Sequence, residues 1–370
     1  MAKSRLHELA DRGQAVWYDT LSRDLVKSGE LAKMMDEDAV TGVTSNPTIF
    51  QKALSSGNAY DEDLKKLLAE TDDPSEIFFS LALQDIRDAC DVLKPAYDAS
   101  DDLDGYVSME VEPGIAYDTE KTFDQARWIA KEVERPNLYV KIPATMPGLP
   151  AIEDCTAKGT SINITLIFSL ERYKAVVEAY LRGLERLVAA GGDPSKVASV
   201  ASFFVSRVDT EADKRLDAAG HPELKGKLAI ANAKLAYQHY LDVFTSKNPR
   251  WAYLEGKGAT KQRCLWASTS TKNPEYRDVM YVEELIGPET VNTMPLETIR
   301  AFQEHGEIRG DTVLEGIDEA HELLKQLAAA GVDYDDVTDT LEAEGVQKFS
   351  DSFDEIVESI RAKRGELAAA

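Results

Sequence analysis

Short apolar runs alternate with amphipathic stretches along most of the chain. Between the runs lie segments with helical spacing, such as SLERYKAVVEAYLRGLERLVAA, and several of them begin at a capping residue and end at glycine or before proline. Strands that alternate with helices pair in parallel through right-handed crossovers. Eight such units predict an α/β protein whose strands close into a (β/α)8 TIM barrel. The runs are AVWYDT (15–20), AVTGVTS (39–45), GYVSMEV (105–111), NLYVKI (137–142), TSINIT (160–165), VASVASFF (197–204), RCLWAS (263–268) and ETVNTM (289–294).

The remaining length is predicted to add helices to the same domain. No Gly/Ser-rich linker, internal repeat or low-complexity tract divides the chain. We therefore expect a single barrel domain over 1–370, with helical insertions at about 47–100 and 218–262 and a helical tail at about 310–370. An open doubly wound sheet is the structural alternative, but no GxGxxG or GxxxxGK(S/T) motif follows a predicted strand.

Polar residues gather at the ends of the predicted strands. In a barrel of this kind, side chains at the carboxyl ends of the strands point into the active-site mouth. Any one of these residues could be an ordinary cap or loop residue, but together they predict one cavity lined by carboxylates, a lysine, amides, hydroxyls and cations. In chain order they are Asp19, Thr44, Asn46, Glu110, Lys141, Asn163, Thr165, Ser202, Arg207, Ser268 and Lys272.

Lys141 stands in the otherwise apolar stretch NLYVKIPATMPG. Taken alone, it would be read as a lysine whose stem packs while its ammonium group reaches water. An isolated lysine among apolar neighbours is also the pattern of an imine-forming amine. Lowering its pKa from about 10.4 to about 7–8 would cost about 4 kcal/mol, which burial and a cationic neighbour can supply. With Asp19 and Glu110 to move protons, the residues favour carbon–carbon bond chemistry through a Schiff base.

Composition and charge exclude several other classes. The net charge of -24 disfavours nucleic acid and anionic membranes as partners. The start of the chain is polar, and no apolar stretch approaches the roughly 20 residues that span a bilayer. Three cysteines without a CxxC pair suit a reducing compartment, so we expect a cytoplasmic protein. No histidine stands at a strand end, which disfavours catalytic triads and metal sites; the histidines are His7, His221, His239, His305 and His321.

Two cations are candidates for binding a phosphate group. Arg207 follows SFFVS. Its planar guanidinium group can donate two hydrogen bonds to a phosphate, and the hydroxyl of Ser202 can donate another. An ordinary ion pair between Arg207 and Asp209 or Glu211 explains the same spacing equally well. Lys272 precedes Asn273 and Pro274, a pair typical of a helix N-cap and first turn, where anions are stabilised.

Six blocks of the sequence resemble, in order, the signature blocks of the transaldolase family. The resemblance runs from about residue 15 to about residue 305, and the chain length is similar to the longer bacterial branch. It implies a transferase of the non-oxidative pentose phosphate pathway that moves a dihydroxyacetone unit from sedoheptulose 7-phosphate to glyceraldehyde 3-phosphate, without a metal or organic cofactor. The blocks are TGVTSNPTIF, SMEV, NLYVKIPAT, INITLIFS, SFFVSR and LWASTSTKNP.

The resemblance also implies roles for the predicted site residues. Lys141 would attack the C2 carbonyl of a ketose phosphate, and Asp19 would take the proton of the C4 hydroxyl. Glu110 would act on carbinolamine formation and breakdown through a water held near Thr165. The sugar and its phosphate would be bound by the remaining residues, namely Thr44, Asn46, Asn163, Ser202, Phe204, Arg207, Ser268 and Lys272.

The sequence departs from the family pattern at one place and leaves rival functions open. Shorter members have a serine–aromatic–arginine order near Ser268, whereas this chain has STSTKN, so Lys272 is the candidate for the second phosphate cation. A lyase resembling fructose-6-phosphate aldolase is one rival, although such proteins are shorter and have glutamine and tyrosine at Glu110 and Phe204. A catalytically silent barrel that only binds ligands is the other. The sequence is compatible with a monomer or a homodimer.

Overall fold

A closed barrel of eight parallel strands forms the centre of the molecule. The computed structural model describes residues 4–55 and 58–369. The strands are hydrogen-bonded in chain order, and the pairing of β1 with β8 completes the ring. The predicted (β/α)8 TIM barrel is therefore confirmed. The strands are β1 (Gln14–Tyr18), β2 (Val40–Thr44), β3 (Val107–Glu110), β4 (Leu138–Pro143), β5 (Ile162–Ile167), β6 (Ser199–Phe204), β7 (Gln262–Ala267) and β8 (Thr290–Met294).

Each predicted β-type run overlaps one of these strands, with both ends placed within two residues. The strands are buried almost throughout because both faces of a parallel sheet are covered. Val140 and Ile142 of β4, for example, are fully buried, and so are Ile164 of β5 and Val200 of β6.

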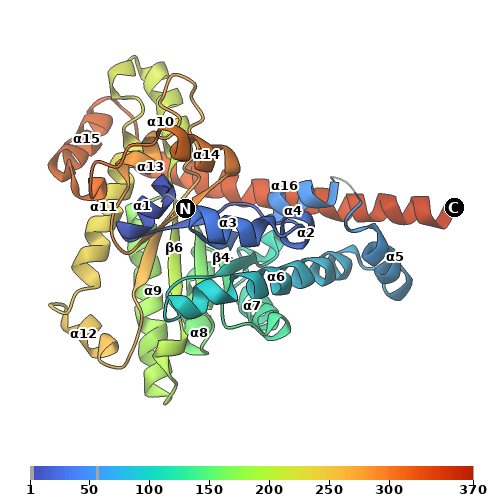
Figure 1. Cartoon of the computed structure of the whole chain (residues 1–370). Coiled ribbons are helices and arrows are strands. Elements are labelled where there is room, and N and C mark those ends of the chain that lie inside the picture. The colour runs from blue at the N-terminus through green and yellow to red at the C-terminus, as the bar shows by residue number, and fades with distance from the viewer. Residues whose placement is uncertain (1–3, 56–57, 370) are drawn as a thin grey trace.

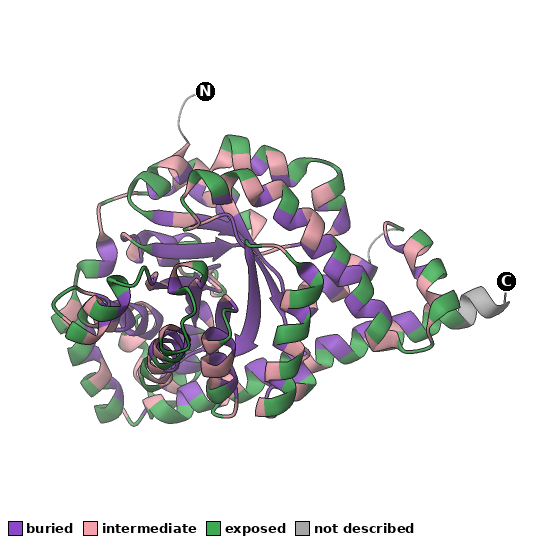
Figure 2. Cartoon of the chain, turned by 90° about the horizontal axis from the view of Figure 1, so that it is seen from below, coloured by how far each residue is buried: buried purple, intermediate pink, exposed green. Residues whose placement is uncertain are grey.

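Helices surround the barrel on its outside. Figure 2 shows buried strands, in purple, enclosed by helices whose outer turns are exposed, in green. The helices are α1 (Arg5–Asp11), α2 (Arg23–Lys27), α3 (Glu30–Asp38), α4 (Pro47–Ser55), α5 (Asp61–Glu70), α6 (Pro74–Ala99), α7 (Thr119–Val133), α8 (Gly148–Ala157), α9 (Leu170–Ala189), α10 (Ser206–Ala219), α11 (Leu228–Val243), α12 (Pro249–Glu255), α13 (Met280–Glu284), α14 (Leu296–His305), α15 (Ile317–Ala329) and α16 (Tyr334–Ala369), with short 3₁₀ turns η1 (Pro113–Ile115), η2 (Pro194–Lys196), η3 (Pro222–Leu224) and η4 (Thr312–Leu314).

Helix α9 illustrates how the sequence specifies these helices. The Ser169 hydroxyl accepts a hydrogen bond from the backbone N–H of Arg172 at 3.0 Å and so caps the first turn. Tyr173, Val176 and Tyr180 recur at helical spacing and are buried against the barrel. Gly183 allows α8 to approach closely, because a Cβ atom there would lie 2.5 Å from the Cβ of Thr156.

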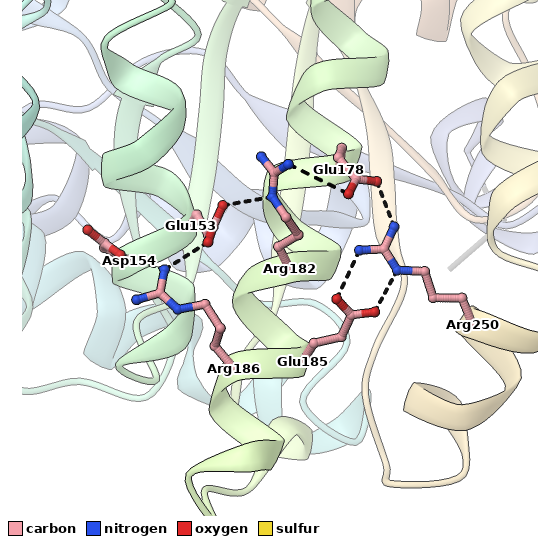
Figure 3. Close-up of polar contacts among 7 residues, drawn as sticks. All are labelled: Glu153, Asp154, Glu178, Arg182, Glu185, Arg186 and Arg250. Carbon is pink, nitrogen blue, oxygen red and sulfur yellow. Dashed lines mark hydrogen bonds and ion pairs between the residues drawn. The ribbon is translucent and has the colours of Figure 1, made fainter.

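Ion pairs join the outer helices α8, α9 and α12 (Figure 3). Arg250 of α12 contacts Glu178 and Glu185 of α9, each at 2.6 Å. Two arginines of α9 in turn contact Glu153 of α8, each at 2.8 Å. These pairs are partly exposed, so each contributes only about 0.2–1 kcal/mol to stability. Their combined effect is to fix α12, in the segment between β6 and β7, against the barrel.

The long helix α16 is the C-terminal element of the fold. It runs beside α4 and extends well beyond the barrel (Figure 1). Near its far end, Lys363 contacts Asp61 at the start of α5 at 2.7 Å. Among the described residues, no helix, α16 included, is long and apolar enough to cross a membrane.

Candidate active site

A cavity of about 550 Å³ opens at the carboxyl ends of the strands. Glu110 and Asn163 do not line it, but both are buried next to Lys141, which pairs with Glu110 on one side and with Asn163 on the other. The barrel therefore brings the predicted residues together from strands far apart in the sequence. Ten of the twelve predicted residues line the cavity: Asp19, Thr44, Asn46, Lys141, Thr165, Ser202, Phe204, Arg207, Ser268 and Lys272.

Lys141 lies on β4, and its side chain is buried. Its Nζ is 3.2 Å from Oε2 of Glu110 and donates a hydrogen bond to the backbone carbonyl of Ser45 at 3.0 Å. The charged group in contact with Nζ is thus a carboxylate, and not the cation that the sequence reasoning expected. A lysine must lose a proton before it can attack a carbonyl. The adjacent carboxylate provides an acceptor for that proton.

Glu110 is enclosed by protein on β3. Phe50, Phe78 and Met109 line the same small pocket as its carboxyl group. Burial raises the pKa of Glu110, and the nearby Lys141 opposes that shift only in part. Neither carboxyl oxygen accepts a well-aligned hydrogen bond from the described residues, so the contact with Lys141 is an ion pair. A carboxyl group that holds a proton more readily than usual suits repeated proton transfer.

Asp19 follows β1 and faces the cavity. Its backbone N–H donates to the carbonyl of Met294 on β8 at 2.9 Å, which fixes the position of the residue. Its Oδ1 accepts a hydrogen bond from the Thr44 hydroxyl at 2.7 Å, and that hydroxyl also lies 2.7 Å from Oγ1 of Thr293. Desolvation raises the pKa of Asp19, while the Thr44 hydrogen bond and then Lys141 act to lower it. Asp19 is therefore placed as a proton acceptor.

The two asparagines lie at different depths. Asn46 lines the cavity, and its Oδ1 caps α4 by accepting from the backbone N–H of Ile49 at 3.0 Å. Asn163 instead donates to the Ser108 hydroxyl at 3.0 Å and accepts from the Ser202 hydroxyl at 2.6 Å. Each of these bonds uses one of the two donor and two acceptor positions of the amide, so the role of Asn163 in substrate binding stays a prediction. Asn163 orients Ser202, which does line the cavity.

Strained backbone shapes two edges of the cavity. Leu166, directly after Thr165, and Ser268, directly after β7, have φ values of 59° and 56°, in the left-handed region. The pairing of β5 with β6 is irregular between Ile164 and Ile167. Such irregularities are frequent next to active sites, where they reorient side chains. The Thr165 hydroxyl is buried at this edge without a hydrogen-bond partner among the described residues, so it is available to a ligand.

Arg207 extends from the start of α10 into the cavity. Its guanidinium carbon lies 5.1 Å from the centre of the Phe204 ring. The alternative ion pair with Asp209 or Glu211 does not form. Asp209 accepts from the Ala229 N–H and the Tyr281 hydroxyl, and Glu211 pairs with two cations of its own helix. Arg207 is therefore directed toward the cavity.

Lys272 lies in the loop after β7 and also borders the cavity. Its Nζ donates to the Ser270 hydroxyl at 2.5 Å. Burial, followed by the charge of Arg207, lowers the pKa of Lys272. The expected helix N-cap at Asn273 and Pro274 is wrong, since these residues form a turn and α13 begins only at Met280. The side chain of Asn273 accepts from the backbone N–H of Glu275 within that turn.

Eight polar residues of the cavity were not predicted from the sequence. Ser270 belongs to the STSTKN block, and its position two residues before Lys272 was an available signal. Thr293 lies on β8, whose sequence run was less informative than the others. Two lysines come from helices and have no strand-end signal: they are Lys52 of α4 and Lys348 of α16. The other four are Thr20, Ser22, Thr48 and Glu297.

The described residues contain no group of three or more His, Cys, Asp or Glu side chains that could hold a metal ion. All three cysteines are free and buried. The side chains that line or adjoin the cavity supply amines, carboxyl groups, amides, hydroxyls and a guanidinium group.

Fold and site together define a class: (β/α)8-barrel proteins with a buried lysine–carboxylate pair at the carboxyl ends of the strands, beside a cationic rim. The sequence matches the family Transaldolase/Fructose-6-phosphate aldolase over residues 16–360. The chain therefore belongs to this family.

Three relatives illustrate how far the similarity extends. The chain is 51% identical to "Transaldolase" of Frankia alni over 363 residues, which cover 97% of each chain. It is 50% identical to "Transaldolase" of Mycobacterium tuberculosis over 360 residues, or 96% of each chain. With "Transaldolase 2" of Streptomyces avermitilis it shares 49% identity over 366 residues, or 98% of each chain.

Proposed function

We propose that the chain is a transaldolase that transfers a dihydroxyacetone unit between sedoheptulose 7-phosphate and glyceraldehyde 3-phosphate through a Schiff base on Lys141. The observation that carries this proposal is the buried Lys141, with Nζ 3.2 Å from Glu110 and in a cavity that also contains Asp19. The names of relatives at about 50% identity over nearly the whole chain support it. A cytoplasmic location is part of the proposal, since free cysteines suit a reducing compartment.

Formation of the Schiff base begins with proton transfer from Lys141 to Glu110. The free amine attacks the C2 carbonyl of the ketose and forms a carbinolamine. Glu110 then returns the proton to the carbinolamine hydroxyl, which leaves as water and gives an iminium ion. The raised pKa of Glu110 favours this exchange, because general acid–base catalysis is most efficient when the pKa lies near the working pH.

Carbon–carbon cleavage follows at Asp19. This carboxylate removes the C4 hydroxyl proton, the C3–C4 bond breaks, and its electron pair moves to the iminium nitrogen to give an enamine. With sedoheptulose 7-phosphate as donor, the leaving aldehyde is erythrose 4-phosphate. In the reverse sense the enamine attacks the aldehyde carbon of glyceraldehyde 3-phosphate, Asp19 returns the proton, and hydrolysis releases fructose 6-phosphate. Arg207 and Lys272 bind the substrate phosphate, and Ser202, Asn46 and Thr165 bind the sugar hydroxyls.

A coupled assay distinguishes the transferase from its two rivals. Fructose 6-phosphate is supplied with or without erythrose 4-phosphate, and glyceraldehyde 3-phosphate is followed. A transaldolase forms product only when the aldehyde acceptor is present. Product without the acceptor would instead establish a fructose-6-phosphate aldolase-like lyase, an activity that the family also includes. No product under either condition, from protein that is folded, would establish a barrel that only binds ligands.

A further inference from the structure

Helix α16 brings a lysine to the mouth of the active-site cavity. Lys348 and Phe349 of α16 line the same cavity as Arg207 and Lys272, although they lie beyond every strand of the barrel in the sequence. Helix α16 is therefore part of the cavity wall.

Close packing fixes the position of α16 on the barrel. Gly345 lies against the end of β5, where a Cβ atom on it would be 3.0 Å from Cδ2 of Leu166. One turn beyond Lys348, the Ser352 hydroxyl lies 2.7 Å from Oγ1 of Thr48 on α4. These contacts flank Lys348 on both sides, so the helix, and not a loop, places its backbone at the rim.

Polar contacts anchor the first turns of the same helix. Arg215 of α10 pairs with Asp336 and donates to the Thr340 hydroxyl at 3.1 Å. Arg172 of α9 lies 3.2 Å from Glu342. Since α10 also carries Arg207, the two helices that deliver Arg207 and Lys348 are tied directly to each other.

Three cations of the cavity, Arg207, Lys272 and Lys348, form no close ion pair with any described residue, although Asp19 and Glu297 line the same cavity. Among the residues that the structure describes, no carboxylate lies within ion-pair distance of Arg207, Lys272 or Lys348. The charge of Arg207, followed by burial, lowers the pKa of Lys348, so these groups are close enough to repel each other. Such a gathering is unusual in a chain of net charge -24. An anionic ligand that binds among them relieves the repulsion.

We infer that Lys348 binds the phosphate group of the sugar substrate, as a specificity-determining residue that the C-terminal helix supplies to the barrel. The inference rests on the proposed function. It predicts that Lys348 contributes to the binding of phosphorylated sugars and contributes little to that of their unphosphorylated counterparts, because its charge meets only the phosphate.

The test compares Lys348→Met with a matched control, Gln347→Met. Gln347 is the preceding residue on α16, is exposed, bonds Asp351 of its own helix and does not line the cavity. Each protein is assayed with fructose 6-phosphate and with fructose as donor, and with D-erythrose as acceptor, so that only the donor phosphate differs. Formation of sedoheptulose is followed in both cases. Inhibition of the fructose reaction by inorganic phosphate is measured on the same proteins.

We expect Lys348→Met to lower kcat/KM for fructose 6-phosphate about fivefold, as for loss of an exposed ionic contact, and to leave the fructose reaction within about twofold. The inhibition constant of inorganic phosphate should rise by a similar factor, Lys348→Arg should restore most of the loss, and Gln347→Met should behave as the unmodified chain. Equal losses for both donors, no loss for either, or the same loss in Gln347→Met would overturn the inference.

Borohydride trapping of the donor on Lys141 separates this inference from the proposed function. If the unmodified chain forms no adduct, the Schiff-base proposal fails, and the role of Lys348 in it fails too. If the adduct forms but Lys348→Met does not discriminate between the donors, only the inference about Lys348 is refuted.

Discussion

Replacing Thr44 with valine tests whether Asp19 acts as the base for carbon–carbon cleavage. The Thr44 hydroxyl donates to Oδ1 of Asp19 at 2.7 Å, and this hydrogen bond is the largest influence that lowers the pKa of a carboxyl group whose burial raises it. Valine has nearly the same shape but cannot donate. The Thr44→Val variant should therefore hold the proton on Asp19 up to a higher pH, while the cavity keeps its form.

The size of the effect follows from the charge on the acceptor. A hydrogen bond to an ionised group contributes about 1.5–3 kcal/mol, and about 1.4 kcal/mol corresponds to a tenfold change in a protonation equilibrium. A base must be ionised to work, so activity is lost as the pH falls through its pKa. Raising the pKa of Asp19 moves this acid limb of the kcat profile upward, by about one pH unit or more.

The assay measures kcat against pH, from about pH 5 to 9, for transfer from fructose 6-phosphate to erythrose 4-phosphate. Two controls accompany it. Thr44→Ser keeps the donor and should restore the original profile. Thr293→Val removes only the outer contact, 2.7 Å from the Thr44 hydroxyl, and should shift the profile less. A Thr44→Val profile that falls uniformly, with its acid limb unmoved, would refute the assignment of Asp19 as the base.

Three further changes probe other parts of the account. Glu110→Gln removes the proton acceptor next to Lys141 and should slow imine formation by about 10²-fold or more, as measured by stopped-flow trapping. Substrate binding should weaken little. Weaker substrate binding with an unchanged rate of imine formation would contradict this role. Arg207→Ala should raise KM for fructose 6-phosphate at least tenfold but change that for fructose little, whereas an equal loss for both would speak against a phosphate contact. Arg250→Ala breaks two partly exposed ion pairs and should lower the free energy of unfolding, measured in urea, by about 1 kcal/mol. Transferase activity should not change. A loss of activity would show that the ion pairs between the outer helices affect the active site.

The sequence was sufficient for the barrel because its strands are buried on both faces. Each strand is buried almost throughout, and the side chain of a polar residue at its carboxyl end faces the cavity at the barrel mouth. This reasoning found Asp19, Lys141 and Glu110, which lie close together although Asp19 follows β1 and the other two lie on β4 and β3.

Features that depend on distant packing were beyond sequence reasoning. Lys348 lies on α16, and no local pattern shows that this helix returns to the barrel mouth. Asn163 was expected at the end of a strand, but it is the second residue of β5 and lies deeper in the barrel, where its amide contacts Ser108 and Ser202. The pairing of Lys141 with Glu110 follows from the register between β3 and β4, which the sequence of a parallel pair does not specify.

The most direct test of the account is chemical capture of the intermediate. The protein is incubated with fructose 6-phosphate, reduced with borohydride, and analysed by intact mass and peptide mapping. We expect a single dihydroxyacetone-derived adduct on Lys141, lost in a folded Lys141→Ala variant that also lacks turnover. Absence of an adduct, or an adduct on another lysine such as Lys272 or Lys348, would contradict the account.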